Sequence, residues 1–313
     1  MNELGEDEPV RRYSVRHRTE YSYDLEVTAS YGRAHLIPRD VPGQQCHDVD
    51  LRIRPEPHLL TERQDFFGNR CSYFEIHRPH TRLAVTVTST VEVTRQVPDL
   101  SRVQTWAWEQ ARDAVRGALS GRERGWPGWS RAELVAVGDL LLPSPQVQLS
   151  EEVRAWAAAV FTPGRSIAEA VVDLVHRIHA ELRYAPGTTG VTTTLPEVLA
   201  RGSGVCQDFA HLAVGALRVA GVPARYVSGY LETVPPPGRP RLEGADASHA
   251  WAAALLPALG WVDLDPTNDR LADASYVVTA WGRDYTDIPP LKGVIFSEGR
   301  SSSLRVAVDV VRS

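Results

Sequence analysis

Residues 201–211 have the sequence Arg201-Gly202-Ser203-Gly204-Val205-Cys206-Gln207-Asp208-Phe209-Ala210-His211, and they decide how the chain is interpreted. A glycine-rich turn leads into a cysteine, and apolar residues then recur at helical spacing as far as Ala220. Gly221 and Pro223 follow, and this combination is typical of a helix end. The stretch therefore predicts a helix that carries Cys206 in its first turn.

A cysteine in the first turn of a helix lies beside unpaired backbone N–H groups and the positive end of the helix dipole, which both favour the thiolate. Acyl transfer by a thiolate also needs a base and a third group that orients this base. His249 begins an apolar, strand-like segment, and Asp265 ends the next one. Because consecutive strands are usually neighbours, we expect His249 and Asp265 to lie side by side, next to Cys206.

Four motifs together resemble the transglutaminase-like superfamily, and most closely its bacterial two-domain branch. The motifs are Gly204-Val205-Cys206-Gln207-Asp208-Phe209-Ala210-His211, Gly221-Val222-Pro223-Ala224-Arg225-Tyr226-Val227-Ser228-Gly229-Tyr230, Ser248-His249-Ala250-Trp251, and Gly260-Trp261 to Asp265-Pro266-Thr267. The resemblance implies a papain-like α+β core in which the nucleophile helix packs on an antiparallel sheet. It also implies that Cys206 is the nucleophile, His249 the general base and acid, and Asp265 the residue that orients His249.

The chain of 313 residues is long enough for two domains. Several short alternating segments predict an antiparallel β-sandwich or half-barrel over residues 11–97, after a disordered tail at 1–10. This region resembles the N-terminal β-domain of the bacterial branch at residues 17–23, 36–39 and 65–69. The hydrophobic period then becomes helical, which predicts a helical connector at 98–146 and a catalytic domain at 147–313.

Within the second half, helices come first and strands afterwards, which predicts an α+β fold with segregated elements. Capping boxes at Ser166–Glu169 and Thr194–Glu197 open two helices before the cysteine. We expect one antiparallel sheet built from the strands of His249 and Asp265, from Tyr276–Trp281, and from the alternating segment Leu304–Val310. The Pro- and Gly-rich loop at 233–247 is expected to select substrate.

The remaining candidate residues lie around the predicted cleft. The tetrahedral oxyanion needs the backbone N–H of Cys206 and a second donor, for which Gln207 and Tyr184 are candidates. Trp251 either walls the cleft or packs in the core. Asp208 is expected to serve the helix N-terminus, and His211 to make a polar contact beside the cleft.

A metal site is a weaker interpretation of the same residues. Cys206, Asp208, His211 and His249 are all possible zinc ligands, but Cys206 and Asp208 are two residues apart and point to different faces of a helix. No calcium loop is present in the sequence either. We therefore predict neither a metal nor a cofactor.

Composition limits the location and the partners of the protein. The net charge is −5 with scattered basic residues, so nucleic acid is not an expected partner. No apolar run approaches the ~20 residues that span a bilayer, and the N-terminus is acidic, which predicts a cytoplasmic protein without a membrane contact. Cys46 and Cys71 are expected to be reduced rather than bridged. The oligomeric state stays open.

Three functions are compatible with these residues. The first is hydrolysis of a peptide-like or glutamine-type amide through a thioester, with a peptide or protein that carries the amide as substrate. The second is transglutamination, in which an amine accepts the same acyl group, because loops and water access choose the acceptor. The third belongs to another class, a peptide-binding or assembly module without turnover. The intact Cys206, His249 and Asp265 favour an enzyme.

Overall fold

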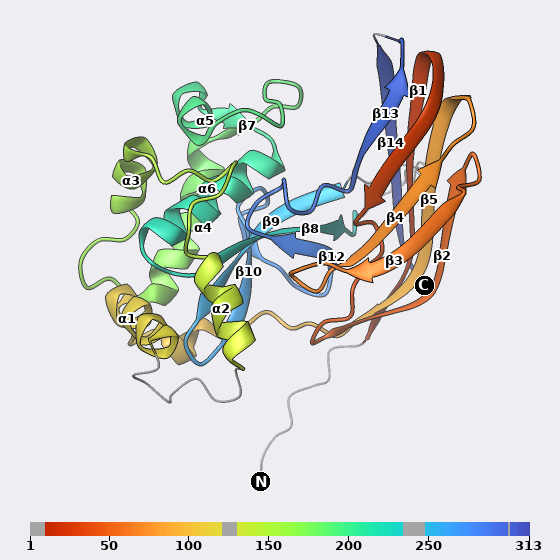
Figure 1. Cartoon of the computed structure of the whole chain (residues 1–313). Coiled ribbons are helices and arrows are strands. Elements are labelled where there is room, and N and C mark those ends of the chain that lie inside the picture. The colour runs from red at the N-terminus through yellow and green to blue at the C-terminus, as the bar shows by residue number, and fades with distance from the viewer. Residues whose placement is uncertain (1–9, 121–129, 234–247, 300) are drawn as a thin grey trace, which may run out of the picture.

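The computed structural model describes residues 10–120, 130–233, 248–299 and 301–313. Two parts lie side by side, a mixed helix-and-sheet part and a tall, curved β part (Figure 1). The α+β class and the N-terminal antiparallel half-barrel are as predicted. The predicted tail lies outside the described residues except for residue 10, and so does the loop at 234–247.

The β part contains five strands from the first hundred residues, arranged in the order β2-β5-β1-β4-β3 with antiparallel neighbours. The bounds are β1 (Arg11–Ala34), β2 (Gln44–Arg54), β3 (Leu59–Gln64), β4 (Arg70–Ile76) and β5 (His80–Val93). One face of β5 is buried because successive side chains of a strand point to opposite faces. Thus Val85, Val87, Val91 and Val93 are buried, while the residues next to them are partly exposed. β1 is long enough to pair with β5 along its first half and with β4 along its second.

The end of the chain also joins this sheet. β13 (Leu291–Ser297) and β14 (Ser302–Arg312) both run antiparallel along β1 (Figure 1). The prediction that the segment Leu304–Val310 completes the sheet of the second half is therefore wrong. An alternating pattern indicates one buried face but does not identify the partner strand. Here the partner is β1, whose edge would otherwise be unpaired, and Val308 and Val310 pack beside Tyr13.

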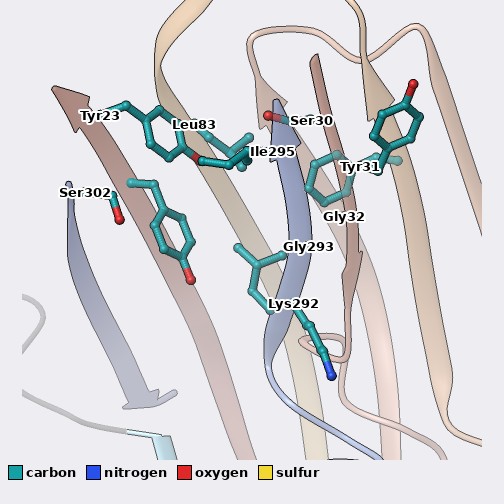
Figure 2. A pocket seen from close by; sticks show the side chains of 12 residues that line it. Tyr23, Ser30, Tyr31, Gly32, Leu83, Lys292, Gly293, Ile295 and Ser302 are labelled. Carbon is teal, nitrogen blue, oxygen red and sulfur yellow. The ribbon is translucent and has the colours of Figure 1, made fainter. Parts of the chain in front are cut away.

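A small hollow of about 150 Å³ lies among β1, β5, β13 and β14. Figure 2 shows Tyr23 and Ser302 on one side of it and Ser30 and Ile295 on the other. This volume is below the ~300–1,000 Å³ of pockets that hold drug-sized ligands, so we assign it no ligand.

The second part begins with helices and continues into a five-stranded antiparallel sheet of order β11-β10-β9-β8-β12. The helices are the short 3-10 helix η1 (Leu100–Val103), α1 (Trp108–Leu119), α2 (Arg131–Asp139), α3 (Glu151–Ala158), α4 (Ile167–Glu181), α5 (Leu195–Arg201) and α6 (Cys206–Val219). The strands are β8 (Ala224–Leu231), β9 (Ser248–Leu256), β10 (Gly260–Asp265), β11 (Arg270–Leu271) and β12 (Tyr276–Gly282), and the pair β6 (Arg183–Tyr184) and β7 (Ser203–Gly204) is parallel.

The helix predicted from the cysteine stretch is α6, and it lies in the centre of this part. Its residues from Asp208 to Arg218 are all buried. It packs on one face of the sheet, against alternate residues of β8 and β9 such as Ala224, Ala250 and Ala252. The small side chains of these strands let the helix approach closely, and the apolar stripe of α4 covers the same core.

The two parts are joined along the outer edge of β12 by side-chain amides. Gln44 donates to the carbonyl of Val278 at 2.9 Å and accepts from its N–H at 2.8 Å. Asn69 does the same for Trp281, at 2.8 Å and 3.0 Å. These amides take the place of a neighbouring strand, so the free edge of β12 is satisfied by the first sheet.

Two further expectations concern the whole chain. Cys46 and Cys71 are not bonded to each other, as predicted, and Cys71 is buried. No helix of the described residues is both long and apolar enough to pass through a bilayer.

Candidate active site

Cys206 is the first residue of α6, at the N-terminus of the helix, and is partly buried. The preceding Gly202 has a left-handed φ of 60° and ends α5, which turns the chain sharply into β7. Asp208 accepts hydrogen bonds from the backbone N–H of Val205 at 2.8 Å and from the hydroxyl of Thr189 at 2.6 Å. The buried Asp208 therefore fixes the first turn of α6 and does not face a cleft.

Gly204 is the position that brings β7 close to this carboxylate. A Cβ atom at residue 204 would lie 2.7 Å from Oδ2 of Asp208 and 2.9 Å from its Cβ. Any larger residue would have to displace the group that holds the first turn of α6. The glycine before Cys206 thus allows the tight entry into the helix.

His249 and Asp265 lie on neighbouring antiparallel strands, as predicted from the sequence. β9 begins just before His249, and β10 ends at Asp265. Nε2 of His249 is 2.8 Å from Oδ2 of Asp265. The side chain of His249 is 10% exposed and that of Asp265 is completely buried, so this contact is shielded from water.

Three side chains bind the same oxygen of Asp265. Oδ2 accepts from the hydroxyl of Tyr276 at 2.6 Å and from the amide of Asn268 at 2.7 Å, in addition to His249. Oδ1 accepts the backbone N–H groups of Thr267 at 2.9 Å and Asn268 at 3.3 Å. Burial would raise the pKa of Asp265, but its bonds to His249, Asn268 and Tyr276 lower the pKa below its ordinary value. The carboxylate is therefore held ionised.

The electrostatics of His249 follow from its two partners. Burial alone would lower the pKa of His249, but the hydrogen bonding and the charges of Asp265 and Cys206 raise it to about 10. Since Nε2 is bound to Asp265, Nδ1 is the nitrogen left for the sulfur. The arrangement favours an imidazolium that is paired with the Asp265 carboxylate.

Tyr184 and Gln207 lie near Cys206. The parallel pairing of β6 with β7 places Tyr184 opposite Gly204, two residues before the cysteine. Tyr184 is 53% exposed, and the charge of Cys206 contributes, after burial, to a raised pKa of its hydroxyl. Gln207 is partly buried in the first turn of α6. Tyr184 is thus the more accessible of the two candidate donors.

Trp251 packs in the core, one of the two roles expected for it, and His211 makes a buried polar contact. Trp251 is completely buried in the core on the sheet face opposite α6, where its ring stacks behind His249 with centroids 6.0 Å apart. His211 is buried on α6, and its Nε2 accepts the backbone N–H of Tyr285 at 3.1 Å. Trp251 lies two residues after His249 on β9, so both side chains point to the same face of the sheet and the indole packs behind the imidazole.

Sequence reasoning missed the residues that support Asp265. Asn268 could have been found from the local sequence, because an Asp at the start of a turn often forms hydrogen bonds with the residues that follow it. Tyr276 had none, since it lies eleven residues further along the chain and only the tertiary structure brings its hydroxyl to Asp265. Arg270 in turn donates to the Tyr276 oxygen at 2.9 Å.

The zinc interpretation finds no geometric support in the described part of the chain. There, no three side chains among His, Cys, Asp and Glu are grouped so that they could hold a metal ion. Asp208 is occupied by hydrogen bonds at the helix N-terminus, and His211 faces a backbone amide.

Comparison with known proteins agrees with this geometry. Residues 154–266 match the transglutaminase-like superfamily, and residues 13–92 match the bacterial transglutaminase-like N-terminal region. The chain belongs to the transglutaminase-like superfamily. The core match contains Cys206, His249 and Asp265.

Relatives of this superfamily member match either almost the whole chain or about a third of it. An uncharacterised protein of Mycobacterium tuberculosis is 43% identical over 308 residues, which cover 96% of this chain and 93% of that protein. A protein-glutamine gamma-glutamyltransferase of Pseudomonas aeruginosa is 35% identical over 101 residues, 31% of this chain and 15% of that protein. The crystal structure of a candidate cysteine protease from Cytophaga hutchinsonii superimposes with a TM-score of 0.74 over 97% of this chain and 91% of that chain, at 19% identity, and shares the fold.

Proposed function

We propose that the protein is a cysteine-dependent hydrolase of peptide-like or glutamine-type amides. The observation that carries the proposal is the 2.8 Å contact between Nε2 of His249 and Oδ2 of Asp265, with Cys206 close enough to help raise the pKa of His249. A base that is oriented by a buried carboxylate and lies next to a nucleophile at a helix N-terminus has the parts that nucleophilic acyl transfer needs.

In the proposed reaction the Cys206 thiolate attacks the amide carbonyl carbon, and a C–S bond forms. His249 gives its proton to the leaving nitrogen, the C–N bond breaks, and an amine or ammonia departs from the thioester. Water then attacks the thioester while His249 takes one of its protons, which releases the carboxylic acid and restores Cys206. Asp265 keeps His249 in the required orientation and stabilises the imidazolium throughout.

The oxyanion of each tetrahedral intermediate needs preorganised donors. The backbone N–H of Cys206, at the start of α6, is one of them. We assign the second to the hydroxyl of Tyr184, because its β-strand runs beside the residues that precede Cys206 and its side chain is exposed. Loss of such a donor typically costs ~3 kcal/mol of transition-state stabilisation.

Transfer to an amine is the second candidate, and the similarity to a protein-glutamine gamma-glutamyltransferase over 101 residues favours it. Both reactions share the thioester, so the acceptor alone distinguishes them. Products formed from a mixed pool of peptides and a primary amine identify this acceptor by mass spectrometry. Cleaved peptides or loss of ammonia indicate hydrolysis, whereas a mass gain equal to the amine minus ammonia indicates transfer.

The matched variants for this assay are Cys206→Ala and Cys46→Ala. Cys46 is also a partly buried, unbridged cysteine, but it lies in the first sheet. We expect Cys206→Ala to abolish turnover and Cys46→Ala to retain it. Turnover that survives Cys206→Ala contradicts the proposal.

Alkylation separates an enzyme from a binding module without turnover. An ordinary free thiol titrates near pH ~8.5, so its reaction with iodoacetamide slows at neutral and acid pH. We expect Cys206 to be alkylated rapidly well below that pH, and His249→Ala to remove this reactivity. An ordinary thiol profile at Cys206 in the wild-type protein would favour the module.

A further inference from the structure

A second cavity, of about 520 Å³, lies between three parts of the molecule. The residues that line it belong to the loop at 66–68 of the first sheet, to helix α2, and to strands β8, β10 and β12. The neighbours of Arg225 on β8, Ala224 and Tyr226, pack in the core with α6, so Arg225 faces the opposite side of the sheet. The cavity is thus on the sheet face away from α6, and its volume is in the range of ligand pockets.

Aromatic rings and guanidinium groups are stacked along one wall. The guanidinium carbon of Arg225 lies 3.6 Å from the ring centroid of Trp281 and 4.1 Å from that of Trp261. The guanidinium carbon of Arg39 lies 3.4 Å from the Trp281 centroid. The guanidinium groups of Arg39 and Arg225 are both so close to this ring that they must occupy its opposite faces. The indoles therefore hold the Arg225 guanidinium in a fixed plane.

Arg225 forms no direct ion pair with a carboxylate of the described residues. Arg225 is 7% exposed, makes no hydrogen bond to any residue of the described ranges, and its Nε is buried without a partner. The carboxylate whose charge acts on it most, Asp263, lies 3.5 Å from Arg95 instead. Burial lowers the pKa of Arg225 to about 9. Buried charges in proteins are normally paired, so this wall is suited to an anion.

We propose that this cavity binds a small carboxylate that carries an aromatic or flat apolar group. A carboxylate matches the planar edge of a guanidinium, with which it forms two parallel hydrogen bonds. The flat group would pack against Trp261 and against Phe66, which is 67% exposed although it is apolar. A free aromatic acid and the carboxyl terminus of a peptide both have this chemistry.

The cavity is separate from the candidate active site. Arg225 pairs with Ala253 of β9, whereas His249 pairs with Gly229 of β8, four residues away along both strands. At ~3.3 Å per residue this separation is about 13 Å. Binding at Arg225 therefore does not require Cys206 and is independent of the proposed hydrolysis.

Titration calorimetry of the full chain tests the proposal. The protein used is the Cys206→Ala variant, so that the proposed hydrolysis does not consume the peptide. The probes are phenylacetate, its neutral analogue 2-phenylethanol, and the dipeptide glycyl-phenylalanine. We expect phenylacetate to bind at least tenfold more tightly than 2-phenylethanol and to shift the NMR signals of the Trp261 and Trp281 indoles. Tighter binding of the dipeptide than of phenylacetate would identify a peptide carboxyl terminus as the natural ligand, and weaker binding a free acid.

Two variants test whether binding occurs in this cavity, and a third variant serves as the control. Arg225→Lys keeps the charge but loses the planar edge, and Ala136→Phe fills the cavity from α2 without changing Arg225. Each should weaken phenylacetate binding at least tenfold. Arg177→Lys, at another arginine stacked on a tryptophan, should not. Absence of phenylacetate binding, equal binding of 2-phenylethanol, or unchanged binding in Ala136→Phe would overturn the proposal.

Discussion

The hydroxyl of Tyr276 donates a 2.6 Å hydrogen bond to Oδ2 of Asp265, the oxygen that also contacts His249. Tyr276 begins β12 and Asp265 ends β10, so the bond reaches from one strand to another at the buried end of the site. Arg270 donates to the same tyrosine oxygen at 2.9 Å. The orientation of His249 thus depends on a chain of groups that extends from Arg270 through Tyr276 to Asp265.

Tyr276→Phe should reduce kcat/KM about tenfold, because it removes a hydrogen bond to a buried carboxylate that is worth roughly 1–3 kcal/mol. Initial rates of amide hydrolysis measure the effect. Tyr230→Phe is the control, since it also removes a buried tyrosine hydroxyl, one that donates to the carbonyl of Leu36. Equal losses in the two variants would show that Tyr276 has no specific role in the site.

Activity should decline as the pH rises through about 10, because the raised pKa of His249 keeps the imidazolium protonated up to that pH. Asp265→Asn removes the charge that raises this pKa, so the alkaline limb should move toward the ~6.5 of an ordinary histidine. Rates from pH 5 to pH 11 check the shift. Asp269→Asn alters the exposed pair of His176 and Asp269 and should leave the profile in place. A limb that does not move in Asp265→Asn would contradict the assigned pairing.

Gln44→Ala should lower the free energy of unfolding by about 1–3 kcal/mol, because it leaves the N–H of Val278 without a partner at a buried edge, while the carbonyl of Val278 keeps the backbone N–H of Arg39 at 3.2 Å. Urea denaturation at pH 7 measures this change. The neighbouring Gln45 is exposed, so Gln45→Ala should change stability by no more than about 0.5 kcal/mol. Similar values for the two variants would mean that the amide does not secure β12.

Stability should fall as the pH decreases from about 6.5 to about 4. Burial lowers the pKa of His17 to about 4. The pKa of His211 is also lowered to about 4, mainly by burial. Between these pH values the unfolded chain binds protons that the folded chain does not, so each histidine costs up to about 3 kcal/mol by pH 4. Urea midpoints across this range should show a shallower slope for His17→Gln than for the exposed His47→Gln. Equal slopes would show that His17 does not contribute to the acid sensitivity.

The sequence alone determined the local features of this protein. Helical spacing located α4 and α6, and the capping box at Thr194 located α5, because periodicity and capping act within a few residues. The capping box predicted at Ser166 does not form, since the Ser166 side chain makes no hydrogen bond at the start of α4. The order of two adjacent strands was sufficient to bring His249 beside Asp265, since consecutive strands usually pair. Alternating segments predicted the N-terminal β-domain, and the resemblance agreed with it.

Only the tertiary structure decided which distant segments meet. Alternation gave the segment Leu304–Val310 one buried face, but packing against β1 chose its sheet. The sequence left open whether Trp251 walls the cleft or packs in the core, and the tertiary structure placed it in the core. Tyr276 at Asp265 and Arg225 between two indoles arise from contacts across separate strands, which no local pattern encodes because their energies depend on groups far apart along the chain.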